Sequence, residues 1–197
     1  AGVDFENKLV AFDEWPALKP TTPFGQLPIY EEEGLGALTQ SDVIHRYLAE
    51  KHGLFGKNAI EKARIDEAYE IVNELFQAVM KAHFVVKTDE AKAEVLSATV
   101  PKYVKTLKTL LERNGNNGFL VGDSITLADV QAFHALNNLV RPLSKEAIAE
   151  LQSYLDGVRK SNEGFSKFLK ESISATSLPS FAGFAHLPEL FAGEFDN

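Results

Sequence analysis

The residues best suited to binding chemistry lie between Pro23 and Ser41. Leu27-Pro28 stands between a glycine-containing loop and a short apolar segment, and a proline pushes the residue before it into an extended conformation. An X-Pro bond before a strand is also the usual place for a cis peptide, which would turn the N–H and C=O groups of Leu27 outward. Leu27 would then offer one donor and one acceptor, the pattern that pairs with another peptide in strand fashion.

Ser41 precedes an amphipathic segment over residues 42–52 and is predicted to be the N-cap of a helix there. The free N–H groups of a first helical turn attract anions, so a carboxylate could bind at this point. Leu27 and Ser41 together indicate a surface for a small peptide that ends in carboxylates. The alternative is purely structural: a turn, an edge strand and a capped helix that bind nothing.

Three motifs surround this surface: W-x-x-x-K over residues 15–19, P-F-G-Q-x-P over residues 23–28, and Q-S at residues 40–41. With I-H-R-Y-L over residues 44–48, they resemble the glutathione-binding half of the glutathione transferases, in particular the sigma class and its nematode relatives. The resemblance implies an α/β thioredoxin-like N-terminal domain, incomplete in this sequence, followed by an all-α C-terminal helical domain.

The resemblance also implies a site for glutathione, and its members by position are Trp15, Lys19, Gln26, Leu27, Pro28, Gln40 and Ser41. Trp15 and Lys19 would contact the glycyl end, with Lys19 paired to its carboxylate. The main chain of Leu27 would bind the cysteinyl backbone, and Gln40 and Ser41 would hold the γ-glutamyl carboxylate with Gln26 close by. Three of these residues also have a purely structural alternative: Trp15 as a core anchor, Lys19 as a solvated charge and Gln40 as a surface residue.

The family begins with a strand and a helix that have no counterpart here, because residues 1–5 resemble the turn after that first helix. In the sigma class the catalytic group is a Tyr just after the opening strand. We therefore expect the catalytic residue to lie before Ala1 and the sequence to start late. The alternatives are a genuine short form, or a partner that supplies the strand.

The leading hypothesis for function is a glutathione transferase that uses glutathione as cosubstrate. Such an enzyme lowers the thiol pKa from about 8.5 towards neutrality, and the thiolate attacks an electrophile in an apolar pocket. The pocket would draw on residues 77–84 and on the C-terminal tail. Sigma relatives include detoxifying enzymes, which conjugate electrophiles, and prostaglandin isomerases. The alternative is a non-catalytic, glutathione-transferase-like structural or binding subunit docked in a larger assembly.

Composition restricts the classes of function. The chain has 197 residues, of which 45% are hydrophobic, so one or two domains with a core are expected. A net charge of −8 disfavours nucleic acid as a partner. The chain has no Cys, and its five His show no metal-type spacing, so no metal site is predicted. No apolar run approaches the ~20 residues that span a bilayer, and we expect a cytoplasmic protein.

Short strands are predicted over residues 5–10, 28–31 and 37–39, followed by helices over 42–52, 60–84, 90–113, 145–158 and 162–172. Pro101 should kink or restart the helix predicted over residues 90–113. Thr126 and Asp129 form a predicted capping box, a motif that the transferases carry in a buried helix of their second domain. The expected domains are residues 1–54 and 58–178, with an apolar tail over 179–197.

Two further predictions concern partners. Glu74 matches a family position, more often Asp, whose acid reaches across a homodimer to the neighbour's glutathione; a solvated helix face is the alternative. Arg46 and Tyr47 are predicted to hold helix and domain together rather than to touch substrate. The apolar tail over 179–197 is predicted to pack back on the helical domain, and the alternatives are a lid over an apolar substrate or a docking strip for another protein.

Overall fold

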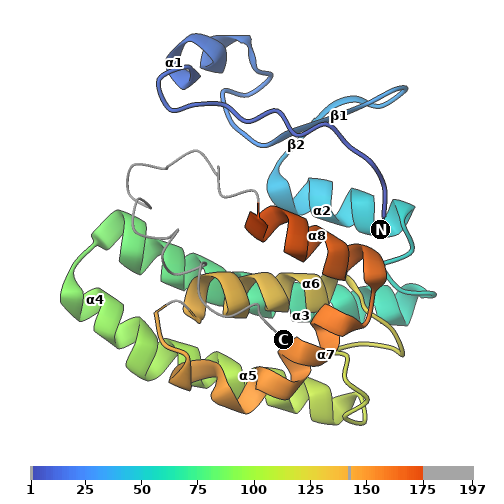
Figure 1. Cartoon of the computed structure of the whole chain (residues 1–197), viewed down its shortest axis with the longest axis vertical. Coiled ribbons are helices and arrows are strands. Elements are labelled where there is room, and N and C mark those ends of the chain that lie inside the picture. Colours follow the sequence, from blue (N-terminus) through green and yellow to red (C-terminus); the bar gives the residue numbers. More distant parts are fainter. Residues whose placement is uncertain (1, 142, 175–197) are drawn as a thin grey trace.

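Two strands and short helices make up the first part of the chain, and a bundle of helices makes up the rest (Figure 1). The computed structural model describes residues 2–141 and 143–174. The small α/β part lies above the bundle in this view, and helix α2 lies between the two. The predicted fold class, a small α/β part followed by helices, is confirmed. The prediction for the tail, residues 179–197, lies outside the described residues.

The first part contains helix α1 (Trp15–Leu18), a 3-10 turn η1 (Lys19–Thr21), and strands β1 (Ile29–Glu32) and β2 (Gly36–Thr39). The strands are antiparallel, with Ile29 opposite Thr39 and Glu32 opposite Gly36. Both strands agree with the predicted segments to within a residue. The strand predicted over residues 5–10 is wrong: these residues join no ladder, because β1 and β2 pair only with each other within the described residues.

Helix α2 (Ser41–Lys51) begins where the sequence predicts, but Ser41 is not its N-cap. The N-cap is Gln40, since the Gln40 carbonyl accepts the first bond of the helix, from the Ile44 amide at 3.0 Å. Ser41 is therefore the first helical residue, and no side chain of the cap closes the first turn. The connection from α2 to α3 passes through the region of the predicted domain boundary, which stays a prediction.

Helix α3 (Ala59–Met80) is the long central helix of the bundle, and a π-helical turn η2 (Lys81–Val86) continues it. The Asn58 side chain caps α3 by accepting from the amides of Ile60 and Glu61, each at 3.0 Å. The segment predicted as residues 90–113 is split into α4 (Asp89–Glu94), a π-helical turn η3 (Val95–Thr99) and α5 (Val100–Arg113). Pro101 stands in the first turn of α5, so the predicted restart is confirmed.

The remaining elements are α6 (Leu127–Phe133), a π-helical turn η4 (His134–Val140), a 3-10 helix η5 (Glu146–Leu151), α7 (Gln152–Lys160) and α8 (Glu163–Ser174). The core lies where α3 packs on α5 and α6. Its largest fully buried side chains include Ile65, Tyr69, Leu75, Leu107, Phe133, Leu136 and Leu155. No helix among residues 2–141 and 143–174 is both long and apolar enough to cross a membrane.

Asp129 is fully buried and organises the start of α6. Its carboxylate accepts from the amides of Thr126 and Leu120 at 2.9 Å and from the Tyr154 hydroxyl at 3.0 Å. Burial raises the pKa of Asp129, and these hydrogen bonds oppose the rise. The predicted capping box is confirmed, and it also ties α6 to α7 and to the loop before it.

We predict that Asp129→Ala lowers the free energy of unfolding by about 3–5 kcal/mol, because buried donors of Leu120, Thr126 and Tyr154 lose their acceptor. Asp123→Ala is the control, since Asp123 lies in the same loop but is exposed and pairs with Lys57 at the surface. Urea denaturation followed by circular dichroism measures both. Equal midpoints for the two variants would contradict the structural role of Asp129.

Candidate functional site

A cavity of about 350 Å³ opens where three separated segments meet. Trp15 comes from α1, residues 25–28 from the loop before β1, and residues 40–41 from the start of α2. The lining residues are Trp15, Gly25, Gln26, Leu27, Pro28, Gln40 and Ser41. The structure thus brings together six of the seven residues proposed from the sequence. A cavity of this size suits a small molecule, because ligand sites run from roughly 300 to 1,000 Å³.

Lys19, the seventh residue, does not line the cavity but lies next to its wall. A Cβ atom added to Gly25 would come within 3.4 Å of the Lys19 Cε atom, so the lysine stem passes directly beside this glycine. Gly25 also has φ +63°, a conformation that side chains rarely adopt. Glycine is therefore needed at position 25, and the Lys19 side chain runs beside this part of the cavity wall.

Leu27 is 47% exposed at the cavity, and its main chain is open to a ligand. Among the described residues, its N–H and C=O groups take part in none of the hydrogen bonds within the protein. The Leu27-Pro28 peptide bond is cis, as predicted. The site therefore presents one backbone donor and one backbone acceptor in a row that leads into strand β1.

Gln40 is the residue whose conformation sequence reasoning missed. Its φ is +69° and its ψ is 112°, outside the helix and strand regions, and its amide Nε2 donates to Gln26 Oε1 at 3.0 Å. A residue other than glycine in such a conformation is strained, and strain of this kind gathers at functional sites. The pairing links the loop before β1 to the start of α2, so the two walls of the cavity are joined through two exposed amides.

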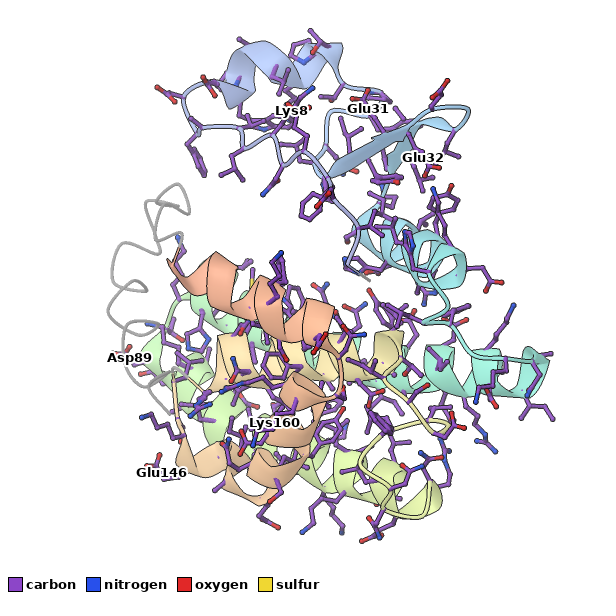
Figure 2. The ribbon with its side chains drawn as sticks, turned by 45° about the vertical axis from the view of Figure 1, so that its right-hand side comes forward. Lys8, Glu31, Glu32, Asp89, Glu146 and Lys160 are labelled. Atoms are coloured by element: carbon purple, nitrogen blue, oxygen red, sulfur yellow. The ribbon has the colours of Figure 1, made fainter. Side chains whose placement is uncertain are left out.

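Glu32 fixes the other side of α2 against the sheet (Figure 2). It accepts hydrogen bonds from the hydroxyls of Tyr30 and Tyr47, at 2.8 and 3.1 Å, and pairs with Lys51. The hydrogen bonds, from Lys51 first and then Tyr30, lower the pKa of Glu32 to about 2. Tyr47 thus holds the helix to β1, in agreement with the prediction that it has a structural role.

Arg46 joins α2 to the bundle. Its Nε donates to Asp66 at 2.7 Å and its Nη2 group pairs with Glu70, both on α3. The predicted structural role of Arg46 is confirmed by these contacts. Glu74, one turn further along α3, is exposed and accepts from the Tyr103 hydroxyl at 2.6 Å, and burial first and this bond second raise the pKa of Tyr103 to about 12. Its proposed reach across a dimer stays a prediction.

No group of three or more His, Asp or Glu within residues 2–141 and 143–174 is arranged to hold a metal ion. The cavity instead offers a helix start without a side-chain cap, one open stretch of backbone, two amides, an indole and a nearby cation. Such a set binds anionic and peptide-like groups, because the helix start attracts a carboxylate and the backbone pairs with an amide.

Comparison with known proteins supports one family. Residues 70–172 match the family described as "Glutathione S-transferase, C-terminal domain". Glutathione S-transferase 1 of Ascaris suum is 35% identical over 170 residues, which is 81% of this chain and 81% of that protein. A probable glutathione S-transferase 8 of Caenorhabditis elegans is 35% identical over 178 residues, 86% of this chain and 85% of that protein.

Solved structures agree in shape. The glutathione S-transferase from Ascaris lumbricoides superposes with a TM-score of 0.76 at 31% identity, covering 86% of this chain and 85% of that one. A Nu-class transferase from Haemonchus contortus gives 0.74 at 31% identity, covering 86% and 84%. Rat hPGDS complexed with a quinoline gives 0.75 at 26% identity, covering 86% and 84%.

The strained backbone at position 40 leads to a stability prediction. We expect the free energy of unfolding of the Gln40→Gly variant to be about 1 kcal/mol higher than that of the Gln40→Ala variant. Glycine adopts a positive φ without strain, whereas alanine is strained there. Both variants lose the amide contact with Gln26, so the comparison isolates the backbone. Thermal unfolding of the two variants measures the difference. An alanine variant as stable as the glycine variant would show that the backbone there is unstrained.

Proposed function

Since this chain belongs to the glutathione S-transferase family, we propose that it binds glutathione in the cavity at the start of α2. The proposal rests on one observation above the others. Six of the proposed residues, from three separated segments of the chain, line a single cavity, and five of them offer a group that one part of a γ-glutamyl tripeptide needs. The cavity volume of about 350 Å³ suits a ligand of this size.

The γ-glutamyl carboxylate would bind at the start of α2. Ser41 is exposed there as the first helical residue, and no side chain of the cap residue occupies the free N–H groups of the turn. The Ser41 hydroxyl can donate to one carboxylate oxygen while a backbone N–H donates to the other. Gln26 and Gln40, already paired with each other, would border the same carboxylate.

The rest of the tripeptide would extend along the loop. The open N–H and C=O groups of Leu27 would pair with the cysteinyl unit in strand fashion. The indole of Trp15 would cover the glycyl end, and the ammonium group of Lys19, beside Gly25, would attract its carboxylate. The two carboxylate ends of the ligand would thus be held separately, one by the start of α2 and the other by Lys19. This arrangement would set the direction in which the tripeptide lies.

In the reaction that we propose, the bound thiol loses its proton and the thiolate attacks an electrophilic carbon of an apolar substrate. In a conjugation the sulfur–carbon bond forms while the bond from that carbon to its leaving group breaks, and the leaving group departs with the electron pair. In an isomerisation the sulfur–carbon bond breaks again after the rearrangement, and glutathione is released unchanged. The chain's own described residues contribute binding and orientation of glutathione. We assign none of them the hydroxyl that stabilises the thiolate. We further propose a sigma-like class, a role in detoxification or isomerisation, a homodimer in which Glu74 reaches the neighbouring site, and a cytoplasmic location.

The alternative is a non-catalytic binding or structural subunit, in which the same cavity would hold glutathione without activating its thiol. The two functions differ in one experiment: retention on a glutathione resin together with turnover of a chromogenic electrophile supports the transferase. Retention without turnover supports the non-catalytic subunit. No retention contradicts glutathione binding and leaves only the structural form of that subunit.

We predict that Ser41→Ala weakens glutathione binding by about 1–3 kcal/mol, because a charge-assisted hydrogen bond is lost in the first turn of α2. Isothermal titration calorimetry measures the change. Ser97→Ala is the matched control, because Ser97 is an exposed serine of η3, remote from the cavity lining, whose hydroxyl donates to the Ala93 carbonyl. An unchanged affinity for the Ser41 variant would show that the carboxylate lies elsewhere.

A further inference from the structure

Tyr69 lies in the middle of α3, fully buried, and contacts three residues of α2. Its hydroxyl lies 2.8 Å from Asp42 Oδ1 and 2.8 Å from His45 Nδ1. Its ring lies under the guanidinium group of Arg46, with 4.8 Å between the Arg46 Cζ atom and the ring centroid. We call Tyr69 with Asp42, His45 and Arg46 the Tyr69 clamp.

The protons of the clamp follow from its chemistry. An ionised carboxylate can only accept, so the Tyr69 O–H group donates to Asp42. The hydroxyl oxygen then accepts from His45, which places the proton of the neutral imidazole on Nδ1. Burial lowers the pKa of His45, and burial together with Asp42 raises the pKa of Tyr69, so both side chains are neutral at pH 7. Each group of the chain of hydrogen bonds has its partner.

Further contacts hold the same turn of α2. Asp42 Oδ2 accepts from Asn73 Nδ2 at 3.4 Å, so α3 contacts both carboxylate oxygens of Asp42. Arg46 reaches along α3 to Asp66 and Glu70. In contrast, only Ile44 and Ala49 of α2 are buried apolar residues. The position of this helix on the bundle therefore depends strongly on polar contacts with α3, and these are concentrated around its first two turns.

The first turn is also the turn that faces the cavity. Asp42 directly follows Gln40 and Ser41, which line the cavity wall. The start of a helix frays most readily, since its first N–H groups have no partners within the helix. A frayed or rotated turn cannot present those N–H groups together, and a site that is competent only part of the time binds with correspondingly lower affinity.

We propose that the Tyr69 clamp holds the start of α2 in its binding conformation, so that Tyr69, a residue of the helical part that does not line the cavity, sets the affinity for glutathione. The proposal rests on the proposed function. Tyr69 is a positioning residue, because it acts through Asp42 and does not touch the ligand. A merely structural Tyr69 would instead affect the stability of the whole protein without a particular effect on α2.

Tyr69→Phe tests the proposal, and Tyr154→Phe is the matched control. Tyr154 is also buried and its hydroxyl also donates to an aspartate, Asp129, but within the helical bundle. Glutathione affinity is measured by calorimetry, and amide hydrogen exchange is followed by mass spectrometry in the full chain. We expect the Tyr69 variant to bind about three- to tenfold more weakly, the loss expected for one buried hydrogen bond. The Tyr154 variant should bind as the natural protein does.

Hydrogen exchange separates positioning from stability. The Ile44 amide is the first of α2 to donate within the helix, and the Leu120 and Thr126 amides both donate to Asp129. Tyr69→Phe should speed exchange around residue 44 and leave residues 120–126 unchanged, whereas Tyr154→Phe should do the reverse. If the Tyr69 variant binds glutathione as well as the natural protein, or if both variants lose affinity equally, the proposal is wrong.

A milder pair covers the case in which Tyr69→Phe does not fold. Arg46→Gln removes the partly exposed part of the clamp, and Arg113→Gln removes a comparable ion pair with α3, made by Arg113 of α5 to Glu67. The first should weaken binding by about two- to fivefold and the second should not; equal affinities overturn the clamp. If the natural protein does not bind glutathione at all, the proposed function fails. The clamp is then tested by hydrogen exchange, which should be faster at residue 44 in the Arg46→Gln variant.

Discussion

The N–H groups at the start of each helix need acceptors, and how each helix meets that need explains much of this molecule. Asn58 accepts at the start of α3, Thr88 at α4, Asn162 at α8, and Thr126 with Asp129 at α6. Helix α2 has no such side-chain cap, although it follows a loop as those helices do. Helices α1, α5 and α7 also lack a side-chain cap, and α5 and α7 continue directly from the turns before them. The start of α2 combines a free first turn with a place in the cavity wall, so an external carboxylate can be its acceptor.

An open helix start is useful only if the helix is held still, and α2 is held from two sides. On the sheet side, Glu32 accepts hydrogen bonds from the hydroxyls of Tyr30 and Tyr47 and pairs with Lys51. On the bundle side, Tyr69 and the carboxylates of α3 hold the other face. Both sets of contacts are polar, and such contacts fix orientation more narrowly than apolar packing does because hydrogen bonds are directional. The cavity is therefore built by contacts that lie mostly outside it.

Sequence reasoning found what depends on local chemistry. Short local segments were enough to predict β1 and β2, and Pro101 and the Thr126–Asp129 pair were enough to predict a restart and a cap. Sequence reasoning failed where the structure of a segment depends on a distant part of the chain. Residues 5–10 have a strand-like composition but no neighbouring strand with which to pair. Ser41 looked like a cap, and only the Gln40 carbonyl shows where the helix begins. The site residues were predicted as a set through the resemblance of their motifs to the transferase family, but the conformation of Gln40 and the contacts of Tyr69 are seen only in the folded structure.

The chain contains one tryptophan, and it is Trp15, half-buried in the cavity wall. All intrinsic indole fluorescence therefore comes from a single place, about as far from the core of the bundle as the fold allows (Figure 1). The tyrosines Tyr69, Tyr103 and Tyr154, in contrast, are buried in the bundle. The natural sequence therefore carries its own optical reporter of the cavity: an indole that senses what enters there and is remote from the packing of the helices.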